Sequence, residues 1–155
     1  GGLPLVVDID TGWGGAFNIA RAIKSMEAAG VAAVHIEDQV AQKRCGHRPN
    51  KAIVPTQEMV DRIKVATDAR INDEFFIMAR TDAFQKDGLQ AAIDRSQACI
   101  EAGADGIFAE AVYELSDYQA FADAISVPLL ANITEFGAPP LYNKRKLAQV
   151  GLDMV

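Results

Sequence analysis

Short apolar runs of strand length alternate with amphipathic stretches of helix length along the whole chain. This alternation is typical of consecutive β–α units around a parallel sheet whose strands are covered on both faces. The expected strands are residues 3–8, 33–37, 75–81, 106–109 and 127–133, and a sixth beginning at 153. The expected helices are residues 16–29, 56–69, 89–102, 116–125 and 144–150. The pattern therefore predicts an α/β fold.

Polar side chains that can do chemistry stand at the end of nearly every expected strand. They are Asp8, Asp10, Glu37, Asp38, Arg80, Thr81, Asp82, Glu110 and Asn132. Barrels of eight β–α units place their active sites at this rim, whereas the alternation alone also permits a doubly wound open sheet. We therefore expect a (β/α)8 TIM-type barrel, present as an incomplete segment. Residues 1–155 form one partial catalytic barrel domain in this interpretation.

The composition excludes several classes of protein. Lys and Arg total 15 against 21 Asp and Glu, and no basic run occurs, so we expect no nucleic-acid partner. The longest apolar stretches, such as residues 127–131, are far shorter than the roughly 20 residues of a membrane span. Two cysteines do not make a disulfide framework, which favours the reducing cytoplasm. The chain is predicted to be a soluble cytoplasmic protein without a membrane partner.

Four acids at the ends of the first two strands suggest a metal site. Asp8 and Asp10 are two residues apart, so their carboxylates project to the same face of a strand. Two adjacent anions need a counter-charge, and Mg²⁺ prefers such hard oxygen ligands. The alternative is that Asp10 caps the turn that follows. Glu37 and Asp38 could join the cation, although strand alternation lets only one of them point inward.

A long loop with a cysteine among cationic neighbours follows the second strand. It contains the sequence KRCGHRPNK, residues 43–51, and long loops of this kind in compact barrels are usually functional lids. Nearby positive charge favours the reactive thiolate form, so Cys45 is equipped for proton transfer. Cys99 lies inside an amphipathic helix and is predicted to be a core residue.

Further polar residues at the strand ends could bind an anionic ligand. The guanidinium of Arg80 can hold a carboxylate with two parallel hydrogen bonds. The alternative is an internal ion pair of Arg80 with Asp82 or Glu110. Asn132 and Thr134 lie on one face of the fifth strand and offer neutral hydrogen bonds.

Two other features are interpreted as structural. His35 lies inside an apolar strand, and no His/Cys cluster with zinc spacing occurs, so a structural histidine is expected. The glycines of TGWGG, residues 11–15, lack both the Walker lysine and the dinucleotide spacing. We interpret them as a tight strand exit rather than a phosphate loop.

Four motifs in order, DIDTGWGG, HIEDQV, KRCGHRPNK and MARTDA, give the chain a strong resemblance to the isocitrate lyase and phosphoenolpyruvate mutase superfamily. The later stretches AIVPTQEMVDRI and ANITEFGAPPL are most similar to its 2-methylisocitrate lyase branch. Those enzymes release pyruvate and succinate in the methylcitrate cycle of propionate breakdown. The resemblance implies a magnesium-dependent carbon–carbon lyase for a small tricarboxylate, assembled as a homotetramer. It also implies that the family's first barrel strands and its C-terminal helices are missing.

The resemblance assigns roles to the matching residues. The metal site would comprise Asp8, Asp10 and Glu37, and the catalytic residues would be Cys45, His47 and Arg80. Substrate binding would fall to Cys45, Gly46, His47, Arg80, Glu110, Asn132 and Thr134. In this scheme Cys45 protonates the departing succinate carbanion when the loop closes. These roles require the acids and the thiol to face one cavity.

Two alternatives stay open at the level of sequence. An isocitrate lyase or an oxaloacetate-cleaving relative would use a similar set of residues. A protein of another class, a barrel that binds a dicarboxylate without catalysis, would keep the binding residues alone.

Overall fold

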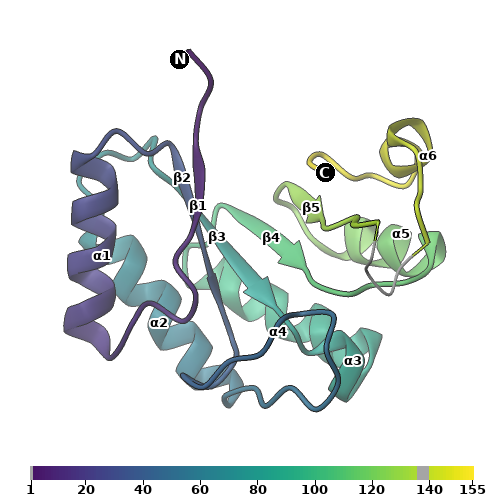
Figure 1. Cartoon of the computed structure of the whole chain (residues 1–155), viewed down its shortest axis with the longest axis horizontal. Coiled ribbons are helices and arrows are strands. Elements are labelled where there is room, and N and C mark those ends of the chain that lie inside the picture. Colours follow the sequence, from purple (N-terminus) through teal and green to yellow (C-terminus); the bar gives the residue numbers. More distant parts are fainter. Residues whose placement is uncertain (1, 136–139) are drawn as a thin grey trace.

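A computed structural model describes residues 2–135 and 140–155, so residues 136–139 of the ANITEFGAPPL motif lie outside the described residues. The described strands form one parallel sheet: β1 (Val6–Asp8), β2 (Ala33–Glu37), β3 (Phe76–Thr81), β4 (Gly106–Ala109) and β5 (Leu129–Ala131). Their order in the sheet is their order in the chain (Figure 1). A doubly wound sheet reverses its strand order near the middle, so that alternative is wrong.

Helices follow the strands and pack against one another in sequence. They are α1 (Ala16–Ala28), α2 (Thr56–Ala69), α3 (Phe84–Asp87), α4 (Leu89–Glu101), α5 (Leu115–Ala124) and α6 (Lys144–Gln149). Helix α1 contacts α2, α2 contacts α4, and α4 contacts α5. This arrangement is a curled half-barrel of the α/β class, which confirms the expected fold class in its coarser form. Within the described residues, none of the helices is long and apolar enough to span a bilayer.

The expected strands agree with the structure in place: β2 and β4 have the expected bounds, whereas β1, β3 and β5 are shorter than expected. The first expected strand is shortened to β1 because its register with β2 begins only at Val6, opposite Ala33. The sixth strand is present as a single parallel bridge between Leu130 and Met154. The amide of Ala131 donates to the carbonyl of Met154 at 3.0 Å, so the sheet continues beyond β5.

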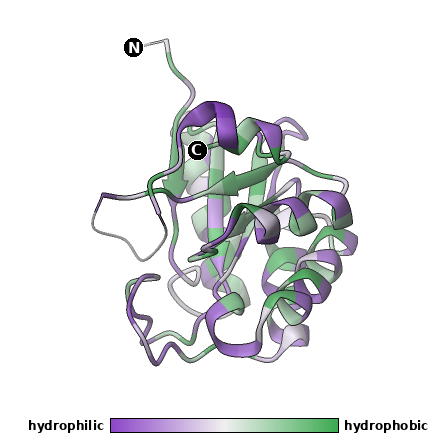
Figure 2. Ribbon diagram, turned by 90° about the vertical axis from the view of Figure 1, so that its right-hand side faces the viewer, coloured by the Kyte–Doolittle hydropathy of each residue, from purple (hydrophilic) through white to green (hydrophobic). Residues whose placement is uncertain are grey.

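The core lies between the sheet and the helices. Ile36 of β2, Ile77 of β3 and Ile107 of β4 are buried against Ile63 of α2 and Phe121 of α5. In Figure 2, the helices carry apolar residues (green) as well as polar residues (purple), as expected for helices with one buried and one exposed face. The buried side chains fix the strands in register, and therefore the relative positions of their carboxyl ends.

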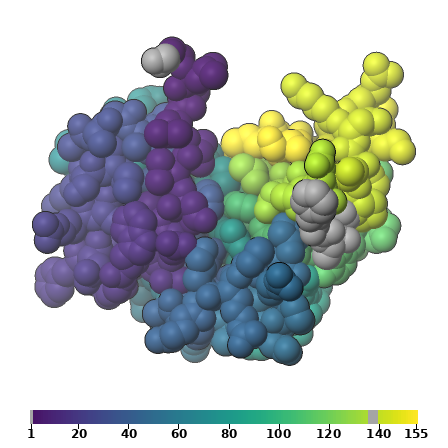
Figure 3. Space-filling model, viewed as in Figure 1, coloured from purple at the N-terminus to yellow at the C-terminus, as the bar shows by residue number. Residues whose placement is uncertain are grey.

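The connection from β2 to α2 forms a long excursion that we call the flap, residues 40–52. Its base is closed by an antiparallel bridge between Gln39 and Ile53, and the amide of Val40 donates to the carbonyl of Ala52 at 2.9 Å. The flap lies at the carboxyl ends of the strands, near α3 (Figures 1 and 3, blue). In the structure, the flap therefore lies at the rim where the polar strand-end residues gather.

Candidate active site

Asp8 and Asp10 meet at the tip of β1, as predicted, but not for the predicted reason. Strand β1 ends at Asp8, and Asp10 follows in a turn with a φ of 50°. The Lys43 ammonium lies 2.6 Å from Oδ1 of Asp10 and 3.9 Å from Oδ2 of Asp8. Its hydrogen bond lowers the pKa of Asp10 below the usual value. A turn, rather than strand alternation, brings these two carboxylates to one cation.

Glu37 joins the same group from the end of β2. Its Oε1 lies 3.5 Å from the Lys43 ammonium, and its Oε2 lies 3.3 Å from Nε of Arg80. Complete burial of this carboxyl raises its pKa to about 7, although Arg80 opposes the shift. Asp38 points elsewhere, accepting a hydrogen bond from the Thr81 hydroxyl at 2.7 Å. The prediction that only one of the two neighbouring acids would point inward is confirmed.

The carboxylates of Asp8, Asp10 and Glu37 are ligands of the kind that a hard cation prefers, but they are not arranged to hold one by themselves. Asp8, Asp10 and Glu37 all contact the Lys43 ammonium, so they already share one positive charge. Yet no set of three or more His, Cys, Asp or Glu side chains in residues 2–135 and 140–155 is arranged to hold a metal ion. Mg²⁺ commonly takes only one or two carboxylates and completes its shell with water or substrate. The chemistry of Asp8 and Asp10 fits such an ion.

Arg80 at the end of β3 is surrounded by carboxylates. Its Nε donates to Oδ2 of Asp82 at 3.0 Å, and its Nη2 lies 3.7 Å from Oε2 of Glu110. The guanidinium also lies over the ring of Phe108, 5.0 Å from its centre. The internal ion pairs left open at the level of sequence are therefore present, and binding of a substrate carboxylate by Arg80 stays a prediction.

His47 of the flap meets the ends of β4 and β5. Its Nε2 lies 3.5 Å from Oε1 of Glu110, and 3.4 Å from both Nδ2 of Asn132 and Oγ1 of Thr134. Asn132 also donates to Oε2 of Glu110 at 3.3 Å. The structure thus brings together four residues that the sequence predicted for one site, from three separate elements.

The Cys45-Gly46 turn is packed on this rim. Cys45 is exposed, whereas Gly46 is buried. A Cβ atom at position 46 would lie 2.5 Å from Nη2 of Arg80 and 2.5 Å from Cγ of Glu110. The flap therefore covers the same rim as the acids, as the sequence predicted. Cys99 is a core residue as expected, and burial raises its thiol pKa to about 12.

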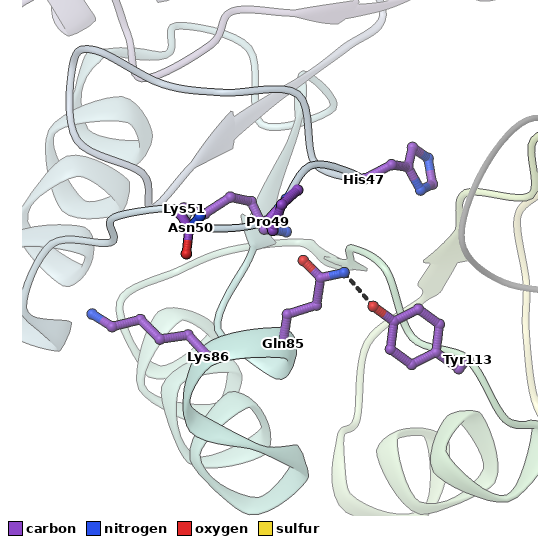
Figure 4. A pocket seen from close by; sticks show the side chains of 7 residues that line it. All are labelled: His47, Pro49, Asn50, Lys51, Gln85, Lys86 and Tyr113. Atoms are coloured by element: carbon purple, nitrogen blue, oxygen red, sulfur yellow. Dashed lines mark hydrogen bonds between the residues drawn. The ribbon is translucent and has the colours of Figure 1, made fainter.

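One cavity borders the flap, and another borders the sheet. One, of about 600 Å³, lies between the flap and α3 and is lined by His47, Pro49, Asn50, Lys51, Gln85, Lys86 and Tyr113 (Figure 4). The other, of about 330 Å³, is lined by Asp8, His35, Arg80, Phe108, Leu130, Ala131, Asn132, Ile133 and Val155. The second cavity lies against the strand face opposite the helices and holds metal-site and substrate-site candidates together.

Sequence reasoning missed several residues of the site. Lys43 was noted only as a neighbour of Cys45, yet it contacts all three acids. Gln39 binds the flap, since its amide donates to the carbonyl of Arg44 at 2.8 Å. His35 lies edge-on to Phe108 with its Nδ1 3.6 Å from Asp8, so it borders the site. These three residues lie in the motifs HIEDQV and KRCGHRPNK, and this was the sequence signal that could have assigned them to the site.

The comparisons with known proteins agree with this arrangement. The family model described as Phosphoenolpyruvate phosphomutase matches residues 2–155. The chain is 67% identical to 2-methylisocitrate lyase of Vibrio cholerae over 99% of its length, covering 52% of that protein. It is 66% identical to 2-methylisocitrate lyase of Shewanella oneidensis, again over 99% of this chain and 52% of that protein. The chain therefore spans about half the length of the curated relatives that it matches.

Solved structures give the same family. An oxaloacetate acetylhydrolase in complex with 3,3-difluorooxalacetate superposes with a TM-score of 0.94 at 36% identity, over 97% of this chain and 52% of that one. A 2,3-dimethylmalate lyase gives a TM-score of 0.93 at 37% identity, over 97% and 51%. A phosphonopyruvate hydrolase in complex with oxalate and Mg²⁺ gives 0.79 at 31%, over 98% and 53%. On sequence and structure alike, this chain belongs to the phosphoenolpyruvate phosphomutase family.

Proposed function

We propose that this chain is the catalytic part of a magnesium-dependent 2-methylisocitrate lyase, which cleaves its substrate to pyruvate and succinate. One observation carries the proposal: the Cys-Gly-His turn of the flap is seated on the rim that also holds the acids of β1 and β2. The identity of about two thirds to proteins named 2-methylisocitrate lyase supports the choice of substrate.

The proposed metal ligands are Asp8 and Asp10, with Glu37 beside them. Mg²⁺ bound there would polarise the hydroxyl and carboxylate of the future pyruvate half and make the alkoxide accessible near neutral pH. Arg80, Asn132 and Thr134 would bind the carboxylates of the substrate. Arg80 is suited to this task because its guanidinium, which here pairs with Asp82 and Glu110, can instead form two parallel hydrogen bonds to a carboxylate of the substrate.

The proposed reaction breaks one carbon–carbon bond. A general base accepts the hydroxyl proton, the oxygen forms the carbonyl of pyruvate, and the electrons of the broken bond pass to the succinate fragment as an enolate. Donors held in advance at the carboxylate oxygens, Arg80 foremost, stabilise that charge. Cys45 then gives its proton to the carbon atom, with His47 beside it on the flap. Seating of the flap excludes water from the carbanion.

A comparison of three substrates tests the proposal. The intact natural protein is assayed with 2-methylisocitrate, isocitrate and oxaloacetate, each with Mg²⁺ and with a chelator. We expect pyruvate and succinate from 2-methylisocitrate at the highest kcat/KM, and no turnover in the chelator. Preference for oxaloacetate would contradict the proposal and favour the activity for which the oxaloacetate acetylhydrolase is named. Succinate binding without Mg²⁺ or turnover would favour a non-catalytic dicarboxylate-binding barrel.

On the resemblance we also propose the setting in which the enzyme works. The five described strands in sequential order are consistent with part of a closed eightfold barrel. We propose that the complete enzyme is a cytoplasmic homotetramer. Light scattering during gel filtration of the intact protein tests the assembly, since a monomer would contradict it.

A further inference from the structure

A buried lysine connects the flap to the end of β3. The Lys51 ammonium donates to the carbonyl of Gly46 at 2.6 Å and to Oδ1 of Asp82 at 2.7 Å. The side chain of Lys51 is 2% exposed, and that of Asp82 is not exposed at all. The sequence placed Asp82 at the rim and Lys51 in the flap, but it assigned neither of them a role in the site. Lys51 enters it from the flap, at the edge of the cavity shown in Figure 4.

This contact depends on the flap being seated. Removing a lysine ammonium from water is costly unless the charge is paired and hydrogen-bonded. Lys51 and Gly46 come from the flap, whereas Asp82 follows β3, so both partners are available together only when the flap lies on the rim. The buried pair therefore favours the seated flap over any arrangement that leaves Lys51 buried without Asp82.

The acceptor of this lysine is itself held firmly. Oδ2 of Asp82 accepts a hydrogen bond from Nε of Arg80 at 3.0 Å, and the backbone amide of Asp82 donates to Oδ1 of Asp38 at 2.9 Å. Asp38 in turn lies 3.5 Å from Nε of Arg95 in α4. One carboxylate thus holds both Lys51 and Arg80, so the flap turn is placed relative to the guanidinium.

The flap turn is fixed on both sides of Cys45. Before it, the backbone of Arg44 donates to and accepts from the side chain of Gln39 at 2.9 and 2.8 Å. After it, the carbonyl of Gly46 accepts from Lys51. The position of Cys45 is therefore set by two side chains that lie outside the turn.

We propose that Lys51 is a positioning residue, which acts through the carbonyl of Gly46 to seat the Cys45-Gly46-His47 turn above Arg80. This inference rests on the proposed lyase function for its effect on turnover. The structural part of the inference, that Lys51 holds the flap turn against the rim, does not require that function.

Lys51→Met tests the inference, because methionine keeps most of the side-chain volume and removes the charge and the donors. Lys86→Met is the matched control: Lys86 lines the same cavity from α3, is exposed, and makes the same change of charge. Lys51→Arg keeps the charge and serves as the conservative variant. Hydrogen–deuterium exchange of the flap and steady-state kinetics are measured on the intact protein for all three.

In Lys51→Met we expect exchange in the flap to become at least about tenfold faster, with peptides from β2 and β3 unchanged. We expect kcat to fall by about a hundredfold, a loss that displacing a reacting group by about 1 Å can cause, and KM to change far less. Lys51→Arg should lie between Lys51→Met and the natural protein in both measurements. Lys86→Met should behave as the natural protein does.

Three outcomes would overturn the inference: unchanged flap exchange and kcat in Lys51→Met, equal acceleration of exchange throughout the core, or the same effects in Lys86→Met. If Lys51→Met does not fold, Lys51→Arg with unaltered flap exchange and an unaltered kcat would overturn it as well. Faster flap exchange in a protein that cleaves none of the three substrates would instead refute the proposed function and support the seat.

Discussion

Replacing Gly46 by alanine tests how tightly the flap is seated. The added Cβ would lie 2.5 Å from Nη2 of Arg80 and from Cγ of Glu110, whereas ordinary contacts of this kind are about 3.5 Å. Neither neighbour can easily yield: Arg80 is held by Asp82 and lies over Phe108, and Glu110 is buried. The turn itself must therefore rise by about 1 Å, which predicts a loss of about a hundredfold in kcat.

The assay is pyruvate release from 2-methylisocitrate by Gly46→Ala, with the melting temperature measured in parallel. The melting temperature should change little, because the flap lies outside the core. Gly15→Ala is the matched control, since a Cβ there meets no atom within 4 Å and the backbone φ is an ordinary −79°. Full activity of Gly46→Ala would refute the reasoning, because it would mean that the turn does not rest on Arg80 and Glu110 during turnover.

Two further predictions concern the acids. The raised pKa of Glu37, about 7 against 4.5, means that the folded state favours its protonated form. This contribution is complete below pH 4.5 and is lost as the pH rises through 7. In chelator, the unfolding free energy of the natural protein should therefore fall, between pH 5.5 and pH 8, by about 2 kcal/mol relative to Glu37→Gln. Urea unfolding measures this, and parallel pH profiles would contradict it. Asp10→Asn should raise the Mg²⁺ concentration for half-maximal activity at least about tenfold, and an unchanged magnesium titration would argue against Asp10 as a ligand.

Much of the fold could be predicted because it depends on local patterns. Helix α2 has the predicted bounds, Thr56–Ala69, since its apolar residues recur with the helical period. Helix α3, Phe84–Asp87, was missed because a single turn is too short to show that period. The start of β1 was misjudged, although its end at Asp8 is as predicted, because Leu3 and Leu5 are apolar but exposed, and hydropathy alone does not report where strand pairing begins.

Most residues of the candidate site could be predicted from the sequence, whereas the contacts between them could be predicted less well. The strand-end rule placed Asp8, Arg80 and Asn132 at one rim, because parallel strands end together. The pairing of Lys51 with Asp82 joins residues 31 positions apart and depends on how the flap folds back. No local pattern carries that information, so the lysines of KRCGHRPNK could not be assigned partners from sequence.

The central claim is that the flap thiol and the strand-end acids serve one reaction. Turnover of 2-methylisocitrate by Cys45→Ser, at saturating Mg²⁺ and with the fold checked by circular dichroism, tests it most directly. Because Cys45 is exposed and lies outside the core, we expect a normally folded protein that has lost nearly all pyruvate release. A folded Cys45→Ser protein that keeps the natural rate would contradict the claim.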